Sequence, residues 1–75
     1  MNQTEIATPQ QIAWAGRVWK LMLPHDRVGC YFQTTGYFDP KQERAFNDWY
    51  NLGWAERREI ANFMLRCHSY YEAAR

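Results

Sequence analysis

Apolar side chains recur at helical spacing in three stretches of the chain, residues 9–23, 40–51 and 54–73. Residues three or four positions apart share one face of an α-helix, so each stretch has the pattern of an amphipathic helix. The first two stretches begin at a proline and the third directly follows a glycine, which are usual boundaries of helices. The pattern therefore predicts an all-α fold, a compact bundle of three principal helices.

The first predicted helix has a strong start signal and two apolar stripes. The run Thr8-Pro9-Gln10-Gln11 has the form of a capping box, with threonine at N-cap, proline at N1 and glutamine at N3. Pro24 predicts that the helix ends at Leu23. The stripes consist of Ile12, Ala15, Trp19 and Met22 and, beside them, Trp14, Val18 and Leu21. Two stripes indicate burial on two sides, either inside the bundle or against both the chain's own core and a further partner.

Residues 24–38 allow two interpretations. A short extra helix over 26–35 would begin at Asp26 and end at Gly36, with an apolar inner face. That inner face would consist of Val28, Tyr31 and Phe32. The same segment could instead be extended around Thr34-Thr35-Gly36. We prefer the short helix, because an isolated hairpin is only marginally stable in water.

The run Asp39-Pro40-Lys41-Gln42 predicts the start of the second principal helix by the same logic as the first. One face of this helix is expected to be apolar and to consist of Ala45, Phe46, Trp49 and Tyr50. Gly53 predicts its end, because glycine suits the left-handed position that follows many helices.

The last predicted helix carries a heptad-like apolar seam, which consists of Ile60, Met64, Cys67 and Tyr71. The seam can pack on the first helix of the same chain or on a second copy, and we expect some of both. Together with the two stripes of the first helix, the seam predicts a homodimer.

Composition and charge limit the class of protein. With 75 residues, of which 47% are apolar and 17% aromatic, the chain is expected to form one domain with residues 1–7 as a frayed lead-in. No apolar run approaches the roughly 20 residues that span a bilayer, and residues 1–8 lack a secretory pattern. We therefore expect a cytoplasmic protein with no membrane partner. Nine basic and eight acidic side chains give a net charge of +1, unlike the basic balance of typical small DNA-binding domains.

The side chains that catalyse reactions or bind metals lack a suitable arrangement. Two cysteines and two histidines are of the types that zinc prefers, namely His25, Cys30, Cys67 and His68. They contain neither a CxxC nor an HxxxH spacing. The single serine, Ser69, has no glycine-rich elbow beside it, and Glu56 and Glu59 flank two arginines, as on a solvated helix face. The sequence therefore predicts no enzymatic activity, no metal and no cofactor.

Nucleic-acid binding is the main alternative function. The predicted helix pair around Asn51-Leu52-Gly53 has a helix-turn-helix outline. Its second helix carries three arginines that could meet phosphates, namely Arg57, Arg58 and Arg66. Trp49 stands where close helix contact needs a small residue, and Glu56 would repel phosphate. The near-zero net charge also leaves little counterion release. We keep nucleic acid as a partner that is possible and not favoured.

Protein binding fits the composition better. Four tryptophans, five tyrosines and four phenylalanines are more than a core of this size encloses, so some are expected at the surface. Exposed aromatic and arginine side chains are typical of binding hot spots. The candidate partner-binding residues are Trp14, Arg17, Trp19, Arg27, Tyr31, Phe32, Tyr37, Phe38 and Trp54. Tyr37 and Phe38 are expected to be most accessible, because they lie between a glycine and a capped helix.

Residues 8–15, Thr8-Pro9-Gln10-Gln11-Ile12-Ala13-Trp14-Ala15, resemble a helix start found in small proteins of phages and plasmids. The small, aromatic, near-neutral chain also resembles phage-encoded inhibitors, including anti-CRISPR proteins. The resemblance implies an inhibitor that binds and occludes a bacterial host protein. Many such inhibitors are acidic and mimic DNA, whereas this chain is not acidic. The alternative stays a small helical DNA-binding regulator.

Overall fold

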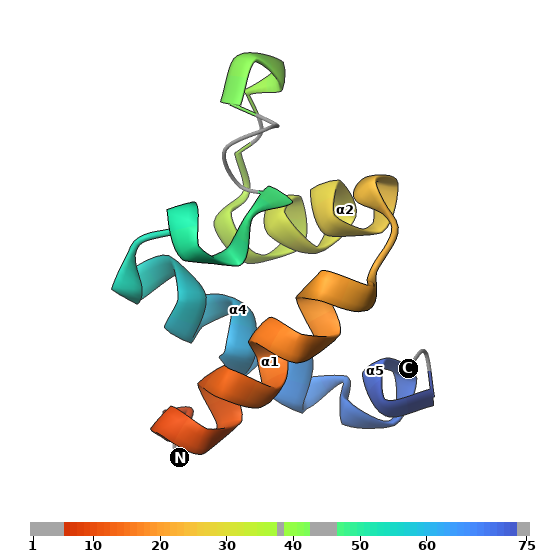
Figure 1. Ribbon diagram of the computed structural model, residues 1–75. Coiled ribbons are helices and arrows are strands. Elements are labelled where there is room, and N and C mark those ends of the chain that lie inside the picture. Colours follow the sequence, from red (N-terminus) through yellow and green to blue (C-terminus); the bar gives the residue numbers. More distant parts are fainter. Residues whose placement is uncertain (1–5, 38, 43–46, 74–75) are drawn as a thin grey trace.

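Helices make up the fold in the computed structural model, which describes residues 6–37, 39–42 and 47–73. The α-helices are α1 (Pro9–Leu21), α2 (Pro24–Thr35), α4 (Trp54–Arg66) and the short α5 (His68–Ala73). Two 3₁₀ helices, η1 (Pro40–Gln42) and η2 (Trp49–Asn51), lie between α2 and α4. Within the described residues there is no strand. Three main helices and one short helix confirm the predicted all-α class (Figure 1).

The start of α1 is as predicted, and its end is not. Thr8 Oγ1 accepts a hydrogen bond from the Gln11 backbone N–H at 3.2 Å, and the Thr8 N–H donates to Gln11 Oε1 at 2.8 Å. These two bonds form the predicted capping box. The helix ends at Leu21 instead of Leu23, because Met22 and Leu23 are extended. An extended Leu23 is what a following proline favours.

The ambiguous segment is a principal helix. α2 begins at Pro24, two residues before the predicted start, because proline suits the first helical position as well as ending a preceding helix. Its end is as predicted, with Gly36 at φ 73°, in the left-handed region. The extended alternative for residues 26–35 is therefore wrong.

The predicted helix over 40–51 is not found as one element in the described residues. The ends of this range form η1 and η2, and residues 43–46 lie outside the description. The expected apolar face is also wrong for its described members, since Trp49 is buried and Tyr50 is exposed. Gly53 does not adopt the left-handed conformation. It is the N-cap of α4, with φ −70° and ψ 162°, and its N–H donates to Glu56 Oε1 at 3.0 Å.

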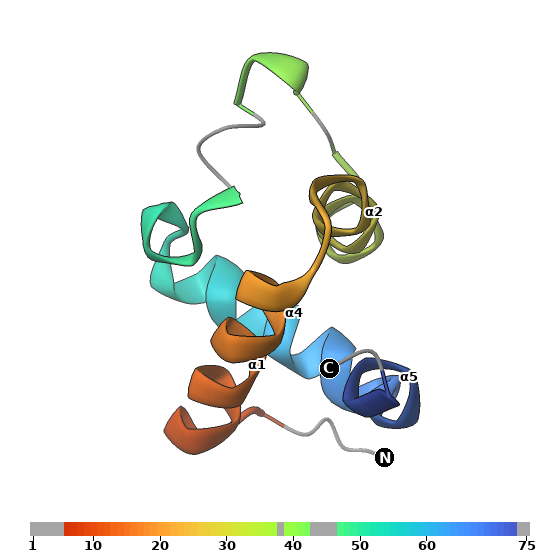
Figure 2. The ribbon, with the colours of Figure 1, turned by 45° about the vertical axis from the view of Figure 1, so that its right-hand side comes forward.

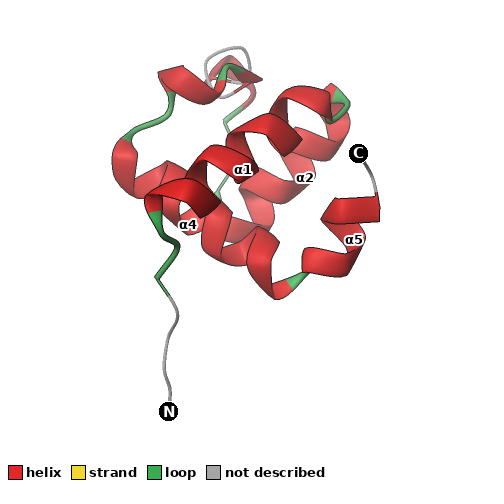
Figure 3. Ribbon diagram, turned by 60° about the horizontal axis from the view of Figure 1, so that its bottom comes forward, coloured by secondary structure: helices red, strands yellow, loops and turns green. Residues whose placement is uncertain are grey.

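The predicted last helix, 54–73, is broken at Cys67. The Cys67 N–H is shared between the carbonyls of Phe63 and Met64, and the Cys67 backbone leaves helical geometry with ψ 36°. Figure 3 shows the short link at which the chain turns from α4 into α5. No glycine or proline marks this break in the sequence. The contacts that α5 makes with α1 and α2, described below, hold it in its separate direction.

The core lies mainly between α1 and α4, which cross in Figure 1. Its largest fully buried side chains are Val18, Trp19, Ile60 and Met64. In Figures 1 and 2, α2 covers the upper side of α4, and η1 lies farthest from α1, α4 and α5.

Most of the apolar surface that predicts a homodimer is buried inside the chain. In the seam, Ile60, Met64 and Tyr71 are buried inside the chain, and Cys67 packs against the core. On the first helix the first stripe faces the core, while Leu21 of the second stripe is 64% exposed. The seam and the first stripe are therefore used inside the chain, whereas Leu21 and the half-buried Trp14 of the second stripe are not fully covered. Homodimerisation stays a prediction without an identified interface.

Candidate functional site

Trp19 and Arg27 form the framework of the site and are not its binding surface. Trp19 is fully buried, with its Nε1 donating to the Asn47 carbonyl at 3.2 Å. Its expected role in partner binding is therefore wrong. The reason is that the segment around η2 covers the indole, since its ring packs against Trp49 with centroids 5.7 Å apart.

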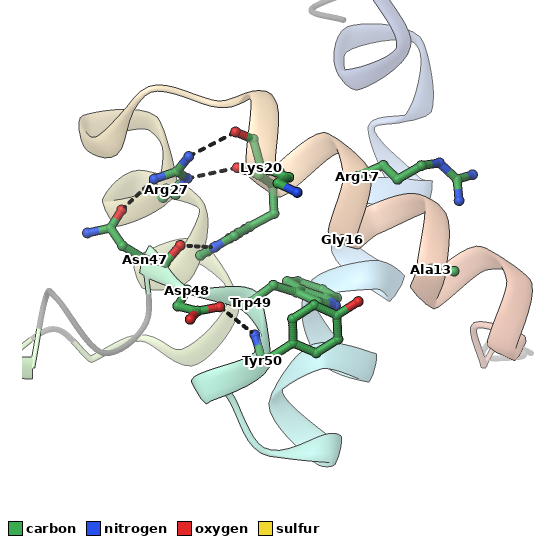
Figure 4. Close-up of a pocket in the computed structure, with 10 residues that line it drawn as sticks. Ala13, Gly16, Arg17, Lys20, Arg27, Asn47, Asp48, Trp49 and Tyr50 are labelled. Carbon is green, nitrogen blue, oxygen red and sulfur yellow. Dashed lines mark hydrogen bonds between the residues drawn. The ribbon is translucent and has the colours of Figure 1, made fainter.

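Arg27 joins three segments through its guanidinium. Its Nε donates to the Trp19 carbonyl at 2.7 Å, and its two terminal nitrogens donate to the Lys20 carbonyl at 3.1 Å and to Asn47 Oδ1 at 2.9 Å (Figure 4). The last carbonyls of a helix lack i+4 partners, and a cation stabilises this end of the helix dipole. The Trp19 carbonyl also accepts from the Met22 N–H at 3.2 Å. Arg27 from α2 thus caps α1 and holds Asn47, which precedes η2.

An aromatic–arginine patch, consisting of Tyr50, Trp54 and Arg57, forms where η2 meets α4. The Arg57 guanidinium carbon lies 5.8 Å from the centroid of the Tyr50 ring and 6.0 Å from that of Trp54. Both distances are within cation–π range. Tyr50 is 81% exposed and Trp54 is 54% exposed, although both are large apolar side chains. The patch therefore presents two rings held by one arginine to solvent.

The local sequence explains why Tyr50 points outward. Asp48 Oδ1 accepts a hydrogen bond from the Tyr50 N–H at 3.1 Å, which starts the 3₁₀ turn. In this tight turn Trp49 is directed into the core and the next residue is directed away from it. Tyr50 is not among the predicted binding residues, because a continuous helix would place Trp49 and Tyr50 on one apolar face. The Asp48 cap was the signal that could have found it.

A surface pocket of about 480 Å³ adjoins the patch. It lies between α1 and η2, and its described lining includes Arg17, Lys20, Arg27, Asp48, Trp49 and Tyr50. Figure 4 shows the Tyr50 ring beside the Trp49 indole, with Gly16 of α1 close by. Gly16 of α1 lets this indole approach closely, since a Cβ there would lie 2.7 Å from Trp49 Nε1. The pocket thus combines an aromatic floor with basic side chains.

The predicted partner-binding residues do not form one surface. Trp14 lies on the other side of α1, where its ring stacks on His68 at 5.2 Å and its Nε1 donates to Glu72 Oε2 at 3.0 Å. These contacts dock α5 on α1, so Trp14 has a structural role. Arg17 is exposed and lines the pocket.

The aromatic residues predicted around α2 are divided between packing and exposure. Tyr31 is half-buried, and its hydroxyl donates to Glu56 Oε2 at 2.9 Å, which joins α2 to α4. Burial, followed by the neighbouring Glu56 carboxylate, raises the pKa of Tyr31. Phe32 and Tyr37 are 51% and 61% exposed, as expected for candidate partner-binding rings. The expected place of Phe32 on the inner face of the short helix is therefore wrong. Phe38 lies outside the described residues.

The three arginines of the nucleic-acid alternative do not share one face. Arg57 and Arg66 are nine residues apart on α4, which places them on roughly opposite sides of the helix at about 100° per residue. Arg57 is engaged with Tyr50 and Trp54, and Arg66 lies over the Phe63 ring at 5.8 Å. Arg58 is half-buried between these directions. A continuous track for phosphates is therefore not formed by these side chains.

The cysteines and histidines are dispersed as well. Within the described residues no group of three or more potential ligand side chains could hold a metal ion. Cys30 is buried near Tyr71, and burial raises the pKa of its thiol, an effect partly offset by hydrogen bonds with Tyr71 and Thr34. Burial likewise is the main cause of the raised pKa of Tyr71. These two groups belong to the packing of α5 against α2.

Comparisons with known proteins give no family. No protein-family model, curated protein or solved structure matches the chain. In the described part of the chain, no helix is long and apolar enough to cross a bilayer.

Proposed function

We propose that this protein is a non-enzymatic interaction domain that binds a bacterial host protein and occludes part of its surface. It would act in the host cytoplasm as an inhibitor made by a phage or another mobile element, in the manner of anti-CRISPR proteins. The observation that carries the proposal is the aromatic–arginine patch, in which Arg57 supports two rings that remain more than half exposed.

The chemistry of the patch favours protein binding. Tryptophan, tyrosine and arginine dominate hot spots, because rigid rings bury much area at little entropic cost. Leaving Tyr50 and Trp54 in water costs the free chain hydrophobic free energy, which a partner would recover by covering them. The pocket beside Tyr50 offers a concave site for a partner side chain.

Affinity capture tests the proposal. The tagged protein is incubated with nuclease-treated bacterial lysate, and a stoichiometric protein partner is expected. The double variant Tyr50→Ala/Trp54→Ala should lose this partner. The control Tyr70→Ala removes a ring of comparable exposure on α5, 65%, and should keep it. Recovery that requires nucleic acid would support the DNA-binding regulator instead.

A further inference from the structure

The geometry points to a specific ligand for the pocket between α1 and η2, namely a carboxylate side chain in an acidic segment of the partner protein. This inference rests on the proposed function, and it names the chemistry that the partner must present.

The first observation is that two cations have no partner among the described residues. Arg17 and Lys20 lie one turn apart on α1, both are exposed, and both line the pocket. Neither side chain makes a hydrogen bond, ion pair or ring contact with any described residue. Exposed cations at a pocket rim attract an anion and set its orientation.

The second observation is the charge balance of the rest of the lining. Arg27 adds a third positive charge, although its nitrogens are occupied by the carbonyls of Trp19 and Lys20 and by Asn47. Asp48 is the one carboxylate among the described lining residues, and its Oδ1 is occupied by the Tyr50 N–H. The described lining is therefore net positive and complements an acidic group.

The third observation is the apolar floor. Trp49 is held against Gly16 at the base, and the Tyr50 ring forms a wall. A carboxylate that enters with its methylene groups against these rings keeps its oxygens near the two cations. The pocket volume of about 480 Å³ accommodates a side chain with its neighbouring backbone.

A protein segment fits better than a nucleic acid. A nucleic-acid strand needs a row of cations along its backbone, whereas Arg57 and Arg66 point to opposite sides of α4. The net charge of +1 also supplies little counterion release. Arg17 and Lys20, next to the rings of Trp49 and Tyr50, instead suit a single acidic side chain.

The four tryptophan indoles provide separate reporters for the test. In a ¹H–¹⁵N spectrum each indole N–H gives one signal, which single Trp→Phe variants assign. The Trp49 signal reports on the pocket, and the Trp54 signal reports on the patch. The Trp14 signal reports on the contact between α1 and α5. The probe is a ten-residue peptide of alternating glutamate and tryptophan, compared with its glutamine counterpart.

We expect the acidic peptide to shift the Trp49 signal and the glutamine peptide to leave it unchanged. The variant Arg17→Gln/Lys20→Gln should weaken acidic-peptide binding at least about tenfold. The charge-matched control Arg58→Gln/Arg66→Gln should bind as the unmodified chain does, because these side chains do not line the pocket. Unchanged Trp14 and Trp19 signals in each free variant show that the fold is intact.

Three results would overturn the inference. The first is a Trp49 signal that does not shift when the acidic peptide is added. The second is equal affinity of the two double variants for this peptide. The third is tighter binding of a ten-nucleotide thymidine oligonucleotide than of the acidic peptide. The proposed function fails separately. Suppose that Tyr50→Ala/Trp54→Ala loses the captured protein while Arg17→Gln/Lys20→Gln keeps it. The interaction surface would then be supported and the carboxylate site would be contradicted.

Discussion

The Trp49 indole lies directly over Gly16, so that a methyl group at position 16 would come within 2.7 Å of Trp49 Nε1. Trp49 is 7% exposed and tilts against Trp19, with ring centroids 5.7 Å apart. Gly16 thus permits the contact that fixes η2 on α1. Because Tyr50 and the pocket follow directly from η2, this contact also fixes the candidate site.

Replacing Gly16 by alanine should destabilise the protein, although alanine is the better helix former. The added methyl group must displace the Trp49 ring, and such overpacking costs about 1–3 kcal/mol. The matched control is Gly29→Ala in α2, where nothing lies within 4 Å of an added Cβ. The free energy of unfolding of that variant should rise by up to about 1 kcal/mol, because alanine has the higher helix propensity. Urea unfolding measures both, and equal changes in the free energy of unfolding would contradict the packing account.

Arg27→Lys should destabilise the protein even though it conserves the charge. Lysine cannot reproduce the fork that donates to Trp19, Lys20 and Asn47 together. Loss of one hydrogen bond with a charged group costs about 1.5–3 kcal/mol. Arg17→Lys is the control and should leave stability unchanged, since Arg17 is exposed. A destabilisation as small as that of the control would show that Arg27 does not hold α1 and Asn47.

Alkaline pH should weaken the protein through Cys30 and Tyr71. Burial raises the pKa of both groups in the folded chain, so the folded state retains their protons more tightly than the unfolded state. This stabilisation is complete below the unfolded pKa values, about 8.5 for cysteine and 10 for tyrosine, and is lost as pH rises through the folded values. Thermal unfolding at pH 7.5 and 10.5 measures the loss. The melting temperature of the variant Cys30→Ala/Tyr71→Phe should fall less on this change of pH. An identical fall would show that these two groups do not cause the loss of stability.

Trp14→Phe should loosen α5 and leave the core intact. Phenylalanine removes the hydrogen bond with Glu72 and reduces the stack on His68. Hydrogen exchange followed by mass spectrometry should show faster exchange in residues 68–73 and little change in α4. Trp54→Phe is the control, because Trp54 lies at the other end of α4. Unchanged exchange in α5 would mean that other contacts hold this helix.

Local signals in the sequence predicted those parts of the fold that depend on neighbouring residues. The Thr8–Gln11 capping box and the left-handed Gly36 are of this kind, because their hydrogen bonds and backbone angles involve only a few adjacent positions. The break at Cys67 has no such signal. The residues just after the break contact Trp14, more than fifty positions earlier, through His68 and Glu72.

The candidate site could be predicted only in part for the same reason. Arg17 and Trp54 are exposed as predicted, Arg17 from its position on the polar side of a helix and Trp54 from the excess of aromatic residues over what a small core encloses. The exposure of Tyr50 and the burial of Trp19 depend on how η2 and α1 meet. The helical periodicity of residues 40–51 carries no information on the 3₁₀ turn that Asp48 starts.

The affinity of the purified host partner shows whether the aromatic–arginine patch is the surface that meets it. Titration calorimetry compares the unmodified protein with Trp54→Ala and Tyr70→Ala, two variants that each remove one exposed ring. Hot-spot residues cost at least about 2 kcal/mol on truncation, so Trp54→Ala should weaken binding more than about tenfold while Tyr70→Ala leaves it within about twofold. Binding that is equally strong with both variants would show that the aromatic–arginine patch is not the surface that meets the partner.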